Sequence, residues 1–283
     1  MAPRKTAKIT DISLAVRTTR VLGISNNKGG VGKTTTAMNL AGAFVAQERK
    51  VLVIDMDPQT NASIAFNVEV TKENPSIRHL LMKENVSLEE CVYSRGEFCD
   101  FVPSDLQLED IQRDLYVDPQ GRLRLREKLQ SAMGKYDFVL IDCPPDVGIL
   151  TQNALVAAQE VIIPVDISFF AIAGLSRMVQ IIEGIQAKEN PDLKVLGILP
   201  TKYDGRTTLS DSTIAAIEKQ GLPIFKTRIR ISVDIIRAQM ERLPVMFYAE
   251  HSNAAQDYIA LANEIMPAKV IPLRARQRKA AER

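Results

Sequence analysis

The feature that most constrains the fold is a glycine-rich loop at residues 26–36, which reads NNKGGVGKTTT and directly follows the apolar run VLGIS. A strand that enters such a loop and leaves it as a helix is the arrangement that a phosphate-binding loop requires. Glycines permit positive φ angles and close backbone approach, so that successive amide N–H groups can surround phosphate oxygens. We therefore expect a helix that begins near Lys33 and directs its N-terminus at a phosphate group.

Apolar, β-branched runs recur along the chain, at residues 21–25, 50–57, 99–104, 136–145, 160–166 and 193–204. Segments with helical periodicity lie between most of them. Continuous apolar strands that alternate with helices are typical of a parallel sheet buried on both faces. The predicted fold class is α/β, a doubly wound, mostly parallel sheet flanked by helices.

The same reading divides the chain into three parts. We expect a short basic N-terminal arm at residues 1–20, one domain at residues 21–268, and a basic, flexible tail at residues 269–283. A hydrophobic content of 46% in 283 residues is ample for a core.

Charge and cysteine content limit the classes of function that the chain can have. The net charge of +2 gives no whole-molecule field that favours nucleic acid, so any basic surface must be local. The three cysteines include no CxxC pair and there are two histidines, which predicts neither a disulfide framework nor a His/Cys metal site. The N-terminal stretch is too polar for a signal peptide, so we expect a cytoplasmic protein.

Each position in the loop has an expected role. Lys33 supplies a point charge for the terminal phosphates, and the Thr34 hydroxyl is placed to ligate magnesium. Thr35 contributes through its backbone amide. Asn27 stands where the strict pattern has its first glycine, and Lys28 follows it. The predicted nucleotide-binding residues of the loop are Asn27, Lys28, Gly29, Gly30, Val31, Gly32, Lys33, Thr34 and Thr35.

Three acidic residues close two of the predicted strands. VLVIDMDPQ places Asp55 and Asp57 at the end of one, and VLIDCPP places Asp142 at the end of another. Ligands of open α/β sheets bind outside these carboxyl ends. We expect Asp142 to hold magnesium through water, Asp57 to position the attacking water, and Asp55 to support the metal shell. Alternatively, Asp55 caps the segment that follows it and has no part in the metal shell.

The chain resembles the ParA-type partition ATPases of the ParA/MinD superfamily of deviant Walker ATPases over nearly all of residues 20–266. The similar segments are NNKGGVGKTTTAMNLA, VLVIDMDPQTNAS, YDFVLIDCPPDVGILTQNAL, EVIIPVDISFFAIAGLS, LPTKYDGRT and HSNAAQDYIALANEI. The resemblance implies an ATP-sandwich homodimer in which Lys28 reaches the phosphates bound by the partner subunit. Lys28, Lys33 and Asp57 are then the catalytic residues.

The resemblance also implies partners. Members of this type bind DNA non-specifically as ATP dimers, associate with the nucleoid, and are released by a centromere-binding or adaptor protein that stimulates hydrolysis. Basic residues in the C-terminal third make the DNA contacts. The candidates here are Arg206, Lys226, Arg228, Arg230 and Arg237. The family's usual arginine run is altered, with Ile231 and Asp234 at two of its positions, and Asp146 replaces a common serine.

ATP is the predicted nucleotide. TKYD at residues 201–204 has the spacing of the guanine-selecting NKxD element, but Thr201 replaces the asparagine that would read the base. In similar proteins this loop lies by the adenine, which makes Thr201 and Lys202 candidates for base contacts.

Two alternatives share the ATPase site. The same machinery could position a protein cargo of the carboxysome or chemoreceptor type. A membrane-associated, MinD-like protein would need an amphipathic C-terminal anchor, whereas Pro267 and Pro272 interrupt this end. We therefore do not expect membrane binding.

Overall fold

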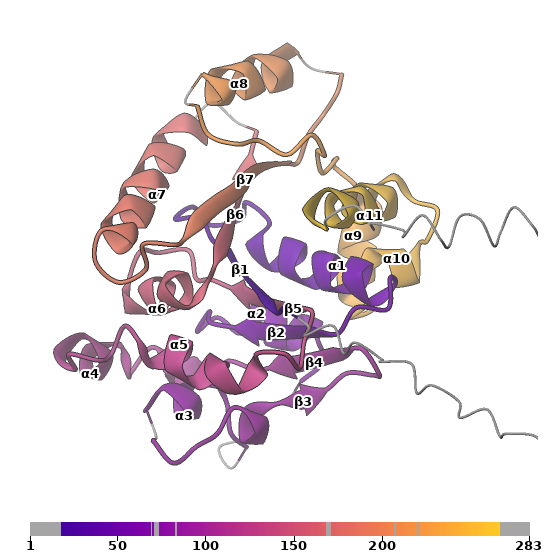
Figure 1. Ribbon diagram of the computed structural model, residues 1–283. Coiled ribbons are helices and arrows are strands. Elements are labelled where there is room, and N and C mark those ends of the chain that lie inside the picture. Colours follow the sequence, from indigo (N-terminus) through magenta and orange to yellow (C-terminus); the bar gives the residue numbers. More distant parts are fainter. Residues whose placement is uncertain are drawn as a thin grey trace, which may run out of the picture.

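A central sheet with helices on both faces forms the protein (Figure 1). The computed structural model describes residues 18–266, apart from residues 69, 71–73, 83, 168–170, 207 and 220. Most of the expected N-terminal arm and the whole of the expected tail lie outside these residues. The strand order is β3-β4-β2-β5-β1-β6-β7. The predicted fold class is confirmed.

The strands follow the apolar runs of the sequence closely. In the described part of the chain, every pairing is parallel except that of β3 with β4 at one edge. The bounds are β1 Arg20–Ile24, β2 Val51–Asp55, β3 Tyr93–Ser94, β4 Cys99–Val102, β5 Phe138–Asp142, β6 Glu160–Asp166 and β7 Lys194–Thr201.

The helices form two layers, one on each face of the sheet (Figure 1). Helices α1, α10 and α11 share one core, and α3, α5, α6 and α7 share the other. The bounds are α1 Lys33–Val45, α2 Asn61–Ala65, α3 Ile77–Met82, α4 Gln112–Val117, α5 Arg124–Lys128, α6 Ile149–Ala157, α7 Ala171–Gln186, α8 Thr208–Glu218, α9 Val233–Met240, α10 Val245–Tyr248 and α11 Asn253–Ile265. Short 3-10 turns lie at Glu89–Cys91, Leu106–Leu108 and Leu129–Ala132.

Strand β2 shows why this sheet must be covered on both sides. All five of its residues are buried. Leu52 and Ile54 belong to one core and Val51 and Val53 to the other, because successive side chains of a strand point to opposite faces. No described helix is long and apolar enough to cross a membrane.

The register of the central strands brings the acidic residues together. Asp55, the last residue of β2, pairs with Asp142, the last residue of β5. Strand β1 lies on the other side of β5, with Ile24 beside Asp142. Since β1 leads into the glycine-rich loop, this loop and the acids share the carboxyl edge of the sheet.

Candidate nucleotide-binding site

The glycine-rich loop is held from both sides by side chains. Asn26 donates from Nδ2 to the Pro164 carbonyl at 2.7 Å, and its Oδ1 accepts from the Lys28 amide at 3.0 Å. The Thr201 hydroxyl, at the end of β7, donates to the Val31 carbonyl at 2.8 Å. The loop is therefore fixed by strands β6 and β7, which lie far along the chain.

Two glycines give the loop its shape. Gly30 and Gly32 have φ angles of 72° and 90°, a region that residues with a Cβ rarely adopt. Gly32 is the N-cap residue of α1, and no side chain caps the helix there. The first amides of α1 thus face the pocket without a side-chain acceptor, as an anion site at a helix N-terminus requires.

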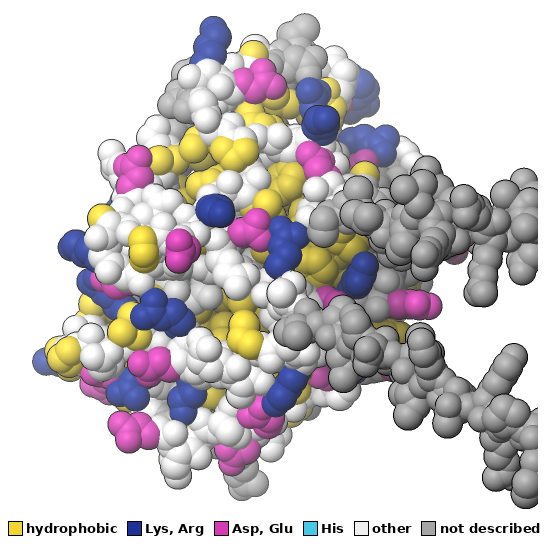
Figure 2. All heavy atoms as spheres, viewed as in Figure 1, with side chains coloured by type: hydrophobic (Ala, Val, Ile, Leu, Met, Phe, Trp, Pro, Cys, Tyr) yellow, Lys and Arg dark blue, Asp and Glu magenta, His cyan; other side chains and the backbone are white. Residues whose placement is uncertain are grey.

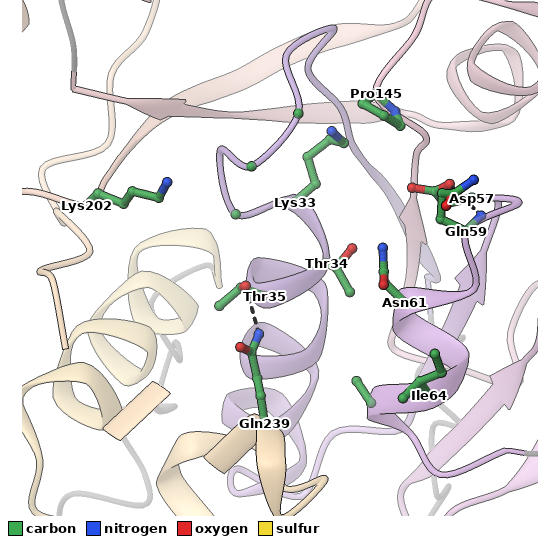
Figure 3. Close-up of a pocket in the computed structure, with 14 residues that line it drawn as sticks. Lys33, Thr34, Thr35, Asp57, Gln59, Asn61, Ile64, Pro145, Lys202 and Gln239 are labelled. Carbon is green, nitrogen blue, oxygen red and sulfur yellow. Dashed lines mark hydrogen bonds between the residues drawn. The ribbon is translucent and has the colours of Figure 1, made fainter. Parts of the chain in front are cut away.

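Lys33 is a cation held under the loop. Its side chain extends below the loop (Figure 3), and Nζ donates to the Lys28 carbonyl at 3.1 Å. Only 7% of the residue is exposed. Burial lowers the pKa of the ammonium group, and the nearby Asp142 opposes this shift. A buried cation of this kind is stabilised by an anionic ligand.

Thr34 and Asp142 form the expected metal-side pair. The Thr34 hydroxyl donates to Asp142 Oδ2 at 2.7 Å, while the buried Oδ1 of Asp142 has no hydrogen-bond partner among the described residues. Burial, and next the charge of Asp55, raise the pKa of Asp142 well above its ordinary value. A divalent cation would reverse this shift, so the pair fits magnesium.

The described side chains do not form a closed metal cage. No group of three or more His, Cys, Asp or Glu among them is placed to hold a metal ion. Magnesium commonly keeps several waters and takes its remaining ligands from one or two carboxylates and the phosphates of a nucleotide. The Thr34–Asp142 pair is consistent with such a shared site.

Asp55 and Asp57 differ in their surroundings. Asp55 is fully buried and accepts hydrogen bonds from the Asp57 amide at 3.0 Å and from the Ser63 amide and hydroxyl at 2.9 and 2.7 Å. Its side chain therefore fixes the turn and helix α2, which is the structural alternative considered for this residue. Its part in a metal shell stays a prediction.

Asp57 lines the pocket itself. Its Oδ1 accepts from the Gln59 amide at 2.9 Å, and the two side chains lie together at one side of the cavity (Figure 3). Burial raises the pKa of this carboxyl group, with the Gln59 amide and Lys33 acting in the opposite direction. Asp57 is placed to act on a molecule bound beside Lys33.

These residues surround a cavity of about 460 Å³ (Figure 3). This volume lies within the range of small-molecule sites. The lining residues are Gly29, Gly30, Gly32, Lys33, Thr34, Thr35, Asp57, Gln59, Asn61, Ile64, Ala65, Pro145, Lys202 and Gln239.

Sequence reasoning did not assign Gln59, Asn61 or Gln239 to this site. Gln59 and Asn61 follow Asp57 within the DPQTNA segment, so their nearness in sequence was a usable signal. Gln239 comes from α9, and its Nε2 donates to the Thr35 hydroxyl at 3.0 Å. No motif in the sequence marks this contact.

Thr201 and Lys202, the candidates for base contacts, have different positions. Thr201 is buried and its hydroxyl is used by the loop, so the structure gives its side chain a supporting role. The exposed side chain of Lys202 extends toward the cavity, with Nζ 3.5 Å from Asp166 Oδ2 (Figure 3). Lys202 is thus the better placed of the two to contact a nucleotide.

The candidate DNA contacts lie mostly around the end of β7. Arg206 forms an ion pair with Asp204 at 2.8 Å, Arg230 pairs with Asp257 at 2.6 Å, and Arg228 stacks on the Tyr203 ring at 4.8 Å. Lys226 and, on α9, Arg237 are exposed. On the face in Figure 2, Lys and Arg are interspersed with Asp and Glu.

Comparison with known proteins agrees with this geometry. A sequence profile of a family described as an AAA domain matches residues 19–195. The chromosome partitioning protein ParA of Caulobacter vibrioides is 36% identical over 265 residues, covering 93% of this chain and 98% of that protein. Fold and site define a P-loop nucleotide-binding ATPase class. Within it, the chain belongs to the ParA-type partition ATPases of the ParA/MinD superfamily.

Solved structures show the same fold. Cobyrinic acid a,c-diamide synthase from Mycobacterium smegmatis, with bound ADP and magnesium, has a TM-score of 0.76 and 31% identity, covering 87% of this chain and 93% of that one. The ATP complex of a single-substitution variant of Cyanothece McdA has a TM-score of 0.79 and 26% identity, covering 88% of this chain and 98% of that one.

Proposed function

We propose that the protein is an ATP-dependent, dimerising switch ATPase that binds DNA without sequence specificity and drives plasmid or chromosome partition. A partner protein that stimulates hydrolysis would complete the cycle. The observation that carries this proposal is one cavity lined by Lys33, Thr34 and Asp57, with the buried Asp142 hydrogen-bonded to Thr34 beside it. The similarity to chromosome partitioning proteins named ParA supports the cellular role.

ATP and magnesium are the cofactors. The loop amides and Lys33 bind the phosphates, while Thr34 and Asp142 would hold the metal. Magnesium supplies charge neutralisation for the phosphate oxygens. Asp57, whose pKa is raised by burial, orients the attacking water and accepts its proton. A second lysine, Lys28, acts on the phosphates bound by the other subunit, which links hydrolysis to dimerisation.

DNA binding follows from exposed cations near the end of β7 and on α9. Lys226 and Arg237 are free to reach phosphate groups without first breaking one of the ion pairs described above. Contacts of this kind read no sequence and weaken steeply with salt. A protein that cycles on and off a chromosome needs both properties.

The experiment compares wild type with Asp57→Ala in two assays. Turnover of Mg-ATP should fall roughly 10²- to 10⁴-fold, the usual contribution of a positioned acid–base group. DNA binding with ATP should persist, because Asp57 acts on water and not on the affinity of the nucleotide. Wild-type turnover in this variant would refute the role of Asp57. DNA binding that is independent of ATP or specific for one sequence would refute the proposed switch.

A further inference from the structure

A second cavity, of about 400 Å³, lies next to the nucleotide site. Its floor is the side of helix α1 that carries Met38, Ala41 and Val45. The edge of the sheet at β3 and β4 forms one wall, and the turn from α9 to α10 forms another. We call it the α1–α10 pocket. Its volume is within the range of sites that enclose a small molecule or a bulky side chain.

The interior of the pocket is apolar. Phe66, Leu243 and Phe247 line it, and Leu243 and Phe247 remain 41% and 51% exposed. Met240, one turn earlier on α9, is 78% exposed. Large apolar side chains gathered around a cavity are typical of a surface that a partner covers.

Two arginines give the pocket its charge. Arg95 donates from Nε to the Phe66 carbonyl at 2.8 Å and also bonds the Asn67 carbonyl, while Arg242 bonds the side-chain oxygen of Asn67. These acceptors are neutral. None of the lining residues is acidic, and within the described part of the chain neither guanidinium forms an ion pair. The mouth of the pocket is therefore a positive rim around an apolar interior.

We propose that the α1–α10 pocket binds a partner protein through one bulky apolar side chain that is flanked by acidic residues. The side chain fills the interior above α1, and the neighbouring carboxylates pair with Arg95 and Arg242. Charge complementarity favours this occupant, since a basic segment or an uncharged one would leave both cations at the rim without a counter-charge.

The pocket adjoins the nucleotide site. Ala65, the last residue of α2, lines both cavities. Helix α2 is joined to the end of β2 by the hydrogen bonds between Ser63 and Asp55, two residues before Asp57. An occupant that presses on α2 therefore acts on the segment that positions Asp57.

A second connection runs through α1. Asn39 accepts from the Val245 amide at 2.7 Å and donates to the Thr35 carbonyl at 2.8 Å. Gln239 bonds the Thr35 hydroxyl at 3.0 Å. The wall formed by α9 and α10 is thus tied to the first turn of the phosphate-loop helix. Binding at the pocket then changes ATP turnover, a consequence that rests on the proposed function.

The test uses fluorescein-labelled peptides and fluorescence anisotropy without nucleotide. The peptides carry a central Leu, Phe or Met flanked by Asp, and matched peptides have either a central Ala or Lys flanks. We expect the Asp-flanked apolar peptides to bind the full chain about tenfold more tightly than either matched set. Equal affinity, or a preference for Lys flanks, would overturn the proposal.

Variants locate the binding. The double substitution Arg95→Glu with Arg242→Glu should weaken the Asp-flanked peptides about tenfold or more, and Phe247→Ala should weaken them as well. Lys188→Glu with Lys194→Glu is the control, because it makes the same charge change at exposed positions elsewhere. Circular dichroism verifies the fold of each variant. Unchanged affinity in the first double variant would overturn the proposal.

Two further measurements test whether a second copy of this chain occupies the pocket and whether binding there changes ATP turnover. If sedimentation without peptide shows that Arg95→Glu with Arg242→Glu abolishes self-association, a second copy occupies the pocket and the proposal fails. Turnover of Mg-ATP is then measured with saturating peptide. Binding without a change in turnover would refute the coupling, whereas a chain without any turnover would refute the proposed function and leave the docking result standing.

Discussion

Replacing Ser63 with alanine should loosen the segment that carries Asp57. The Ser63 hydroxyl donates to Asp55 Oδ2 at 2.7 Å and accepts from the Ser104 amide at 3.0 Å, and all three residues are buried. Ser63→Ala removes a hydrogen bond to a carboxylate, worth about 1.5–3 kcal/mol. It also leaves the Ser104 N–H unpaired, which costs about 1–3 kcal/mol. The expected loss in the free energy of unfolding is about 2.5–6 kcal/mol.

The loss should depend on pH in a defined direction. Burial raises the pKa of Asp55 to about 6 from its ordinary 3.8. The folded state therefore binds the Asp55 proton more tightly than the unfolded state does. This difference stabilises the fold below about pH 4, and the stabilisation is lost as pH rises through about 6. The Ser63 hydroxyl is the largest influence that lowers this pKa. Its removal should destabilise the protein more at pH 7 than at pH 5, where Asp55 is largely protonated with or without the hydroxyl.

Urea denaturation followed by circular dichroism at pH 5 and pH 7, in buffer without magnesium, measures both effects. Ser131→Ala is the control, because Ser131 is exposed and its loss should change stability by less than about 0.5 kcal/mol. A loss below about 1 kcal/mol for Ser63→Ala at pH 7 would show that these hydrogen bonds contribute less to the free energy of unfolding than we assign to them. A larger loss at pH 5 than at pH 7 would contradict the assigned charge on Asp55.

Three other substitutions test the site and its support. Lys33→Ala should abolish ATP binding in isothermal titration, because it removes the buried cation under the loop; retained affinity would contradict this role. Lys28→Gln should leave ATP binding to the monomer intact and remove ATP-dependent dimerisation in size-exclusion chromatography, where an unchanged dimer would count against it. Gly42→Ala should lower the thermal midpoint, because the added Cβ would overlap Pro244 Cβ. The expected cost of this overpacking is about 1–3 kcal/mol. An unchanged midpoint would show that the turn before α10 relaxes to make room.

Much of the fold could be predicted because the sequence patterns that indicate its strands and helices are local. The apolar run at residues 50–57 became β2, Val51–Asp55, and the helix expected near Lys33 begins at that residue. The convergence of Asp142 with the loop also followed from sequence, since parallel strands end at one edge. These inferences needed only the period of the hydrophobic pattern and the chemistry of glycine.

The parts that escaped prediction depend on long-range contacts. Strand β3 is the two-residue segment Tyr93–Ser94, too short to show any alternation. The supporting role of Thr201 depends on β7 lying beside the loop. The spacing of the TKYD segment indicates a base contact instead. Gln239 reaches Thr35 across 204 positions of sequence, and nothing local distinguishes it from other glutamines.

The hydroxyl of Thr201 has a consequence for how the chain is made. The Val31 carbonyl receives its support from a residue 170 positions later, on a strand whose place in the sheet depends on β6. During synthesis this hydrogen bond can therefore form only after β7 has left the ribosome.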